Sequence, residues 1–347
     1  MKAVDNWRHM VDKLNISAKE ENSYSSDKWD ILYSYVLNLT SWNEWVHENG
    51  DEGVKVFTYI ASLITLIGLV ANLATLLILI MNGRTLPLIG RILLTHQATV
   101  DSFVCLMAIG MYLQPFMWTT KLASFDLLLC QIWHGQAIYW GAVLLSVWNV
   151  VLISFDRFML ICHPIKHRNI EKSTMWKVFV IMYILSILFM IPSYLQVKYD
   201  FNTGGCLDQY YIDGDGFKKF MRFYGLGWHL ILYAIPIGIL ITLHTFMKKR
   251  LRERQKIHRS LVLDSADRQI TKTAIAISVV FICSLGWDAF YCSLGFAGLI
   301  EYEFNKPLQI IGVFLATFDS CSTPFIYAVS MPLFRSAVKK TFQCRST

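Results

Sequence analysis

Apolar residues along this chain gather into seven long runs that short polar segments separate. The runs cover approximately Val54–Met81, Arg91–Met117, Ser124–Cys162, Met175–Val197, Phe223–Met247, Ile270–Phe296 and Leu308–Val329. Each run is close to or longer than the roughly 20 residues that an α-helix needs to cross a bilayer. The pattern therefore predicts an all-α protein, a seven-transmembrane helix bundle over residues 54–330.

Polar segments flank the predicted bundle on both sides. Residues 1–53 form a polar N-terminal tail, in which we expect no cleavable signal peptide because no apolar run follows the first Met. After the last span, Pro332–Phe342 alternates apolar side chains with Lys and Arg at helical spacing. Residues 331–347 are therefore predicted to hold an amphipathic helix on the cytoplasmic membrane surface and a short tail.

Composition and charge narrow the class further. With 54% hydrophobic residues and a mean hydropathy of +0.42, the chain is too apolar for an ordinary soluble domain. Four segments hold 20 of the 32 Lys and Arg, which predicts that they face the cytoplasm: Arg84–Arg91, Arg157–Lys177, Lys248–Lys272 and the residues after Leu333. The N-terminus is then extracellular. The basic residues form no single stripe, so a membrane topology explains the net charge of +7 better than a nucleic-acid partner does.

A few polar residues fall inside the apolar runs, where ionisable groups are rare and usually serve a mechanism. Asp156 and Arg157 are adjacent near the end of the third run. They are expected to face the protein interior, although a helix end that reaches into the lipid headgroups is the alternative. Further polar side chains are predicted at mid-bundle depth on separate helices, namely Asn72, Asp101, Ser146 and Asp319.

Two motifs carry a resemblance to a known family. The sequence Ser-Phe-Asp156-Arg157-Phe with the following Ile-Cys-His-Pro resembles the inner end of the third helix in rhodopsin-like G-protein-coupled receptors. The end of the seventh run, Ser-Thr323-Pro324-Phe-Ile-Tyr327, is similar to that family's Asn-Pro-x-x-Tyr motif, with Thr in place of the Asn or Asp. The resemblance implies that Asp156 holds Arg157 in the inactive state and that Arg157 turns toward a heterotrimeric G protein in the active state.

The same resemblance assigns roles to other polar residues near the cytoplasmic face. Pro324 is expected to form a hinge, which lets Tyr327 move inward. Asp267, at the inner start of the sixth helix, is placed to reach Arg157 and lock the inactive state. The alternative for Asp267 is a solvated charge that the helix dipole favours at an N-terminus.

In the middle of the bundle, the resemblance matches Asn72, Asp101 and Ser146 to residues that surround a sodium ion and internal waters. Asp319 adds a second carboxylate that is unusual at its position. Oxygen ligands such as Asp101 and Ser146 suit Na⁺, whereas two close carboxylates can instead share one proton. A hydrogen-bonded packing core without an ion is an equally good alternative.

Cysteines and sequons suggest covalent modifications. Cys130 and Cys206 lie where an oxidising environment reaches the chain, and the resemblance implies a disulfide between them. The interval from Cys130 to Arg157 is about two residues longer than the family's usual spacing, so we expect a bulge or a shifted register there. Asn15 and Asn38 begin glycosylation sequons, and Cys344 is a candidate for palmitoylation.

Aromatic residues in the outer half of the spans predict a ligand pocket with few polar groups. Tyr139 stands where amine receptors carry an Asp, so a cationic amine is not expected. The other predicted pocket residues are Trp140, Trp228, His229, Trp287 and Asp288. Such a lining suits a mostly apolar small molecule or a peptide side chain, while packing or a membrane-interface belt is the alternative for each aromatic residue.

Within the family, the third and seventh helices resemble those of opsins most closely. Opsins hold retinal as a Schiff base on a lysine of the seventh helix, and Thr317 occupies that position here. A hydroxyl cannot form an imine, so no covalent retinal is expected; a noncovalent retinoid or lipid stays open. Opsin relatives without this lysine form a known group in simple animals, including placozoans, and the chain resembles them.

Three functions from different classes follow from these observations. The first is a plasma-membrane receptor that transmits a ligand signal to a heterotrimeric G protein. The second is a non-signalling opsin relative that acts in lipid handling or scaffolding. The third is a transporter or channel with Asp101 and Asp319 on its path, against which the absence of an internal sequence repeat argues. An enzyme is not expected, because no nucleophile–base pair or metal-ligand cluster has convincing spacing.

Overall fold

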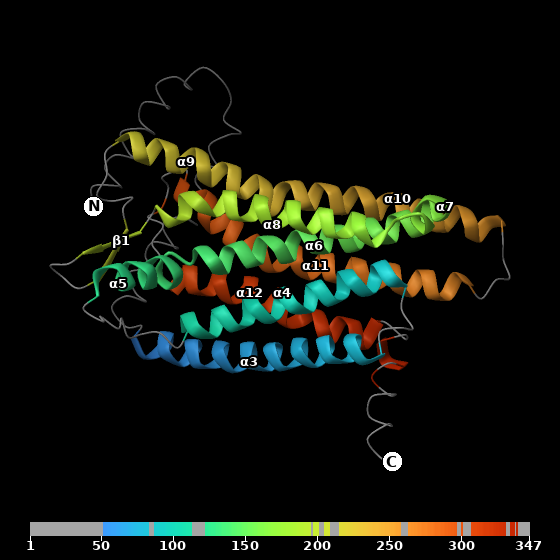
Figure 1. Cartoon of the computed structure of the whole chain (residues 1–347), viewed down its shortest axis with the longest axis horizontal. Helices are drawn as coiled ribbons and strands as arrows, with labels where there is room; N and C mark the ends of the chain where they lie inside the picture. Colours follow the sequence, from blue (N-terminus) through green and yellow to red (C-terminus); the bar gives the residue numbers. More distant parts are fainter. Residues whose placement is uncertain are drawn as a thin grey trace, which may run out of the picture.

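A computed structural model describes residues 51–82, 87–112, 122–195, 197–200, 205–208, 215–257, 263–296, 300, 307–330, 334–336 and 338. Long helices run side by side along its longest axis (Figure 1). Seven stretches of the described residues are long and apolar enough to cross a membrane, which confirms the predicted bundle. The helices that form them are α3 (Asp51–Asn82), α4 (Leu88–Tyr112), α6 (Ala137–Cys162), α8 (Lys172–Tyr194), α9 and α10 (Asp215–His229 and Ile235–Ile257), α11 (Leu263–Phe296) and α12 (Pro307–Ser330).

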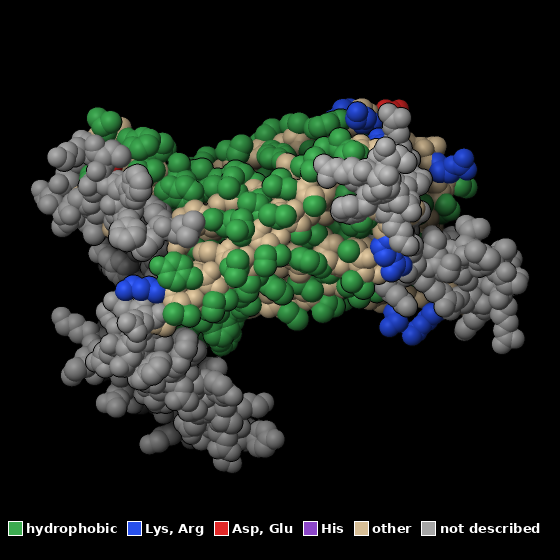
Figure 2. All heavy atoms as spheres, turned by 90° about the horizontal axis from the view of Figure 1, so that it is seen from below, with side chains coloured by type: hydrophobic (Ala, Val, Ile, Leu, Met, Phe, Trp, Pro, Cys, Tyr) green, Lys and Arg blue, Asp and Glu red, His purple; other side chains and the backbone are tan. Residues whose placement is uncertain are grey.

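The third span, centred on α6, lies at the heart of the bundle. Helix α6 packs against α4, α8, α10 and α11, and most of its side chains are buried. Helices α3 and α8 instead expose many large apolar side chains, as expected for helices that face lipid. Figure 2 shows apolar side chains over the middle of one face, with Lys and Arg side chains near its ends. This distribution is the one that a bilayer selects.

The third span is not one regular helix. It begins with α5 (Ala123–Leu129), passes through the π-helical turn η2 (Cys130–His134), and continues as α6 after Gln136. Gln136 has a left-handed backbone with φ of 54°, which ends one helix and lets the next begin. A π-helical turn takes up extra residues without lengthening the helix. The irregularity predicted between Cys130 and Arg157 is therefore confirmed.

Short elements mark the two ends of the bundle and were not predicted. One end, here called the β1 end, carries α5 and the antiparallel strands β1 (Val197–Asp200) and β2 (Gly205–Asp208). The opposite end, called the α7 end, carries α7 (Pro164–Arg168) (Figure 1). A second π-helical turn, η4 (Leu230–Ala234), joins α9 to α10.

Some boundaries predicted from the sequence differ from those of the structure. The fifth and sixth spans extend beyond their apolar runs, because their polar ends continue the helix outside the apolar stretch. Of the predicted surface helix, residues 334–336 and 338 are described as helical. Asn15, Asn38 and Cys344 lie outside the described residues, so their modification stays a prediction.

Candidate functional site

The α7 end of α6 holds a buried acid–base cluster. Asp156 and Arg157 are only 5% and 4% exposed, and Arg157 Nε lies 3.4 Å from Asp156 Oδ2. Pro164 opens α7 at a position where its missing N–H costs nothing, and α7 then places His167 beside the pair. His167 Nε2 lies 2.7 Å from Asp156 Oδ1. Each carboxylate oxygen thus has a nitrogen partner, and the burial of Arg157 argues against the headgroup alternative.

Gly90 of α4 makes room for the Arg157 guanidinium. A Cβ added to Gly90 would lie 2.6 Å from Arg157 Nη2. The guanidinium therefore packs directly against the backbone of α4. Asp267, its predicted partner across the bundle, lies on α11, but its side chain is outside the described residues. The lock between Asp267 and Arg157 stays a prediction.

Pro324 interrupts the hydrogen-bond ladder of α12, and α3 repairs the gap. Proline has no N–H, so the carbonyl of Ser320, four residues earlier, lacks its helical donor. Asn72 Nδ2 of α3 donates to that carbonyl oxygen at 3.0 Å and to the carbonyl of Gly68 at 3.0 Å. The predicted hinge is thereby hydrogen-bonded to a neighbouring helix.

Close packing surrounds the hinge. A Cβ at Gly68 of α3 would lie 2.7 Å from the Cβ of Cys321, so α3 and α12 approach closely only because Gly68 has no side chain. Cys321 Sγ in turn lies 3.7 Å from Cys105 Sγ of α4. Below the hinge, Tyr327 is buried and its ring lies 6.2 Å from that of Phe334. The inward movement expected of Tyr327 stays a prediction.

The carboxylate of Asp101 lies in a polar network between α4 and α6. Gln97 Nε2 is 3.0 and 3.1 Å from its two oxygens, and Ser146 Oγ donates to Oδ1 at 2.7 Å. Asn149 Nδ2 donates to Gln97 Oε1 at 2.7 Å, which orients the Gln97 amide with its N–H groups toward Asp101. All four side chains are buried.

This donor set competes with a sodium ion bound at Asp101 and Ser146. A cation needs oxygen ligands, whereas the Gln97 amide directs N–H donors at both carboxylate oxygens. Rotating that amide would place its oxygen against the carboxylate and break its bond with Asn149. The geometry supports the hydrogen-bonded packing core that the sequence left as an alternative.

Asp319 of α12 is in a different environment. It is 5% exposed, and its Oδ1 has no hydrogen-bond partner among the described residues. Its backbone oxygen accepts hydrogen bonds from Ser322 Oγ at 2.8 Å and Thr323 Oγ1 at 3.2 Å. Thr323, which replaces the family's Asn or Asp, thus bonds to its own helix and also interacts with the Asp101 side chain.

Toward the β1 end, Tyr139 of α6 meets α12. Its hydroxyl donates to the carbonyl of Val313 at 2.9 Å and lies 2.9 Å from Thr317 Oγ1. Gln309 Nε2, also of α12, donates to Gln136 Oε1 at 2.7 Å. These buried bonds join α6 and α12 just where an opsin would carry its retinal lysine.

Several predicted pocket residues come together beside this junction. The Trp140 ring lies 5.2 Å from Tyr139 and 6.5 Å from Trp228 in edge-to-face geometry. Trp287 Nε1 donates to the carbonyl of Leu308 at 3.2 Å, and His229 Nε2 lies 3.1 Å from the carbonyl of Ala289. The indole and imidazole groups thus bond to backbone of α12 and α11, as packing residues also would.

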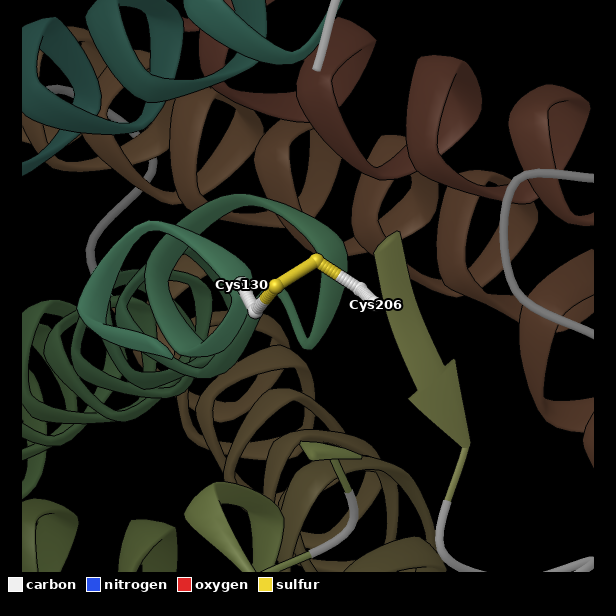
Figure 3. The surroundings of a disulfide bond; sticks show 2 residues. All are labelled: Cys130 and Cys206. Carbon is white, nitrogen blue, oxygen red and sulfur yellow. A yellow bond between two sulfur atoms is a disulfide. The ribbon is translucent and has the colours of Figure 1, made fainter. Parts of the chain in front are cut away.

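A disulfide joins the third span to the β hairpin. Cys130 at the start of η2 is bonded to Cys206 of β2, so the predicted disulfide is confirmed and holds the hairpin against the third span (Figure 3).

On the lipid-facing side, a groove of about 540 Å³ lies between α3, α11 and α12. Its lining is apolar and includes Ile67, Phe318 and Phe325.

Comparison with known proteins identifies the family. Residues 71–327 match the family described as 7 transmembrane receptor (rhodopsin family). The chain belongs to this family. It is 24% identical over 300 residues to the B1 bradykinin receptor of Macaca fascicularis, covering 83% of this chain and 82% of that protein. It is also 23% identical to galanin receptor 2a of Danio rerio over 295 residues, with 83% and 78% covered, and 23% identical to opsin Rh1 of Drosophila melanogaster over 235 residues, with 62% and 61% covered.

Membership of a receptor family confirms the predicted fold class and the expectation that the protein is not an enzyme. Sequence reasoning nevertheless missed several residues of this receptor's polar clusters. Gln97 precedes Asp101 by four residues and Asn149 follows Ser146 by three, so helical spacing alone placed each pair on one face. His167 had no such signal, because only the fold of α7 brings it to Asp156.

Proposed function

We propose that this protein is a plasma-membrane receptor that transmits a ligand signal from the β1 end, outside the cell, to a heterotrimeric G protein at the α7 end. The observation that carries the proposal is the buried cluster of Asp156, Arg157 and His167. Removing a charged pair from water costs several kcal/mol per ion unless its partners compensate, and ionisable groups inside membrane spans usually mark functional sites. A G protein that binds Arg157 would provide that use.

The proposed signal passes along α6. Tyr139 lies near one end of this helix and Arg157 near the other, about 27 Å apart at 1.5 Å per residue. A ligand that separates α6 from α12 would have to break the bonds of Tyr139 with Val313 and Thr317. Any ligand that binds better to the separated state favours that state. At the far end, the same change would release Arg157.

The experiment is a nucleotide-exchange assay with purified receptor and a panel of Gα subunits. We expect exchange above that of empty nanodiscs with at least one Gα class, and its loss in Arg157→Ala.

Charge reversal at the exposed residues Lys249 and Arg252, together with Lys256, should weaken coupling because these residues extend α10 with positive charge. Unaltered coupling at matched expression would show that the charges serve topology alone.

For the ligand, we propose a peptide or a mostly apolar small molecule that contacts the aromatic layer of Tyr139, Trp140 and Trp228. Two of the relatives named above are receptors for bradykinin and galanin by name, which supports a peptide. The opsin relative supports the proposal that this receptor shares ancestry with opsins.

We further propose that the receptor does not bind retinal covalently. Thr317 is buried and its hydroxyl bonds to Tyr139 and to the carbonyl of Val313, so no amine is available at this point. The test is incubation with 11-cis or all-trans retinal, borohydride reduction and mass spectrometry. A stoichiometric retinyl adduct on any lysine of the bundle would contradict the proposal. An adduct found only in Thr317→Lys would support it.

One observation favours the lipid-handling alternative. The groove between α3, α11 and α12 faces the bilayer and is lined by apolar side chains, which suits an acyl chain. Native mass spectrometry of lipids that copurify with the protein would separate the two proposals. A non-signalling lipid carrier should retain a stoichiometric lipid and stimulate exchange on no Gα subunit.

A further inference from the structure

A second buried carboxylate lies toward the β1 end, on α11. Asp288 is 4% exposed, yet within the described part of the chain the only polar group that reaches its side chain is the thiol of Cys292. Cys292 Sγ lies 3.9 Å from each carboxylate oxygen. A thiol is a weak donor with one hydrogen, whereas a carboxylate can accept about four hydrogen bonds. Asp288 is therefore poorly satisfied for a group removed from water.

The hydroxyl and indole donors of three predicted pocket residues are already engaged elsewhere. The Tyr139 hydroxyl donates to Val313, the Trp140 Nε1 donates to Gln136 at 3.2 Å, and Trp287 Nε1 donates to Leu308. Among the described residues, no Lys, Arg or His forms an ion pair with Asp288. The carboxylate thus accepts weaker hydrogen bonds than those that these three side chains donate elsewhere.

Gly312 of α12 determines where this carboxylate lies. A Cβ at Gly312 would be 3.0 Å from Asp288 Oδ1 and 3.5 Å from Trp287 Cδ1. Asp288 consequently contacts the α12 backbone one residue before Val313, whose carbonyl binds Tyr139. A group that inserted beside Asp288 would push α11 and α12 apart at the same level as the junction between α6 and α12.

We propose that Asp288 binds a cationic, hydrogen-bond-donating group of the ligand, a guanidinium or an ammonium. The inference rests on the proposed receptor function and specifies its ligand class. A cation with several N–H donors would satisfy both carboxylate oxygens and neutralise a buried charge. The N-terminal tail, with ten acidic and five basic residues, would favour the approach of such a ligand.

This inference changes the expectation based on α6 alone. Tyr139 replaces the Asp of amine receptors, which removed the usual partner for a cation. Asp288 supplies a carboxylate from α11 instead, one helix away. The ligand would then combine an apolar portion against Trp140 and Trp228 with a basic group at Asp288.

The experiment uses full-length receptor in phosphatidylcholine nanodiscs and two probes of similar shape, phenethylguanidinium and the uncharged phenethylurea. Binding is measured from the shift in thermal unfolding with probe concentration. We expect the wild type to bind the guanidinium at least tenfold more tightly than the urea. Asp288→Asn should lose this preference, whereas Ser293→Ala, an exposed position one turn further along α11, should keep it.

A second variant keeps the test decisive if Asp288→Asn does not fold. Gly312→Ala retains the charge but places a methyl group against Oδ1, and it should weaken guanidinium binding severalfold. Equal guanidinium affinity in wild type and Asp288→Asn would overturn the inference. So would the absence of binding to the wild type when phenethylguanidinium is present at about 50-fold molar excess over receptor or more.

Nucleotide exchange by the ligand-free wild type, measured separately, distinguishes this inference from the proposed function. Exchange on a Gα subunit without guanidinium binding would overturn the ligand class alone. Guanidinium binding without exchange on any Gα subunit would overturn the proposed receptor function alone.

Discussion

The two ends of the bundle each bury a carboxylate, but they supply it with different partners. At the α7 end, Asp156 has Arg157 and His167 within hydrogen-bonding or ion-pair distance. Toward the β1 end, the Cys292 thiol is the only polar group of the described residues that reaches Asp288. The first site is complete within the chain, so a partner must break existing bonds to change it. The second site is incomplete, so a partner can stabilise it by adding bonds. This difference matches an end that is released and an end that receives a ligand.

The largest expected contrast is in stability. Asp156→Ala should lower the free energy of unfolding by about 3 kcal/mol, because it leaves the buried Arg157 without its carboxylate. Asp288→Asn should leave stability unchanged or raise it by about 1 kcal/mol, because it removes a buried charge that lacks a strong donor. Thermal and denaturant unfolding in detergent measure both variants. Equal losses would show that the two carboxylates are equally well paired.

A smaller effect is expected when His167 alone is removed. His167→Ala deletes one of the two partners of Asp156 and should cost about 1–2 kcal/mol of stability. Because Arg157 is then held less firmly, ligand-free nucleotide exchange should rise severalfold. Lys166→Ala, at an exposed position of the same short helix, is the matched control. A rise of similar size in the control would assign the effect to α7 as a whole.

The position of Arg157 can also be changed without altering any charge. Gly90→Ala places a methyl group 2.6 Å from Nη2, so the flexible guanidinium must move away from α4. We expect ligand-free exchange to increase about twofold, with a stability change within about 1 kcal/mol. Gly238→Ala, where a Cβ meets no atom within 4 Å, is the control for the helical preference of alanine. Identical exchange in both variants would mean that Gly90 does not position Arg157.

The smallest effect concerns Asp101, a carboxylate between the two ends. Because Gln97 and Ser146 already donate to it, replacing sodium by N-methylglucamine at constant ionic strength should shift the midpoint of unfolding by less than about 1 °C. Gln97→Ala removes the donors and should introduce a sodium response. A strong sodium response in the wild type would show that the network binds sodium despite the N–H donors of Gln97.

Much of the architecture could be predicted from the sequence. Bilayer thickness imposes a minimum length on each span, so the seven apolar runs were sufficient to predict the bundle. The disulfide between Cys130 and Cys206 was also predicted, from the resemblance to the family and from the oxidising side on which both cysteines lie. The irregular turn after Cys130 was predicted because the interval from Cys130 to Arg157 is longer than the family's usual spacing. The positions of Asp101 and Ser146 along their apolar runs predicted a common mid-bundle depth, and the two side chains are hydrogen-bonded.

What the sequence determined by itself is therefore local: span lengths, the polar face of each helix, and the residues that carry charge into the bundle. Only the tertiary structure decided which charges are satisfied. Asn72 reaches the carbonyl freed by Pro324 because Gly68 lets α3 approach α12, and His167 reaches Asp156 because α7 folds back against α6. Within the described part of the chain Asp288 finds no such donor, and Tyr139 and Trp287 donate to the backbone of α12 instead. A hydrogen bond depends on ångström-scale positions of two helices, and these are fixed by packing among all seven.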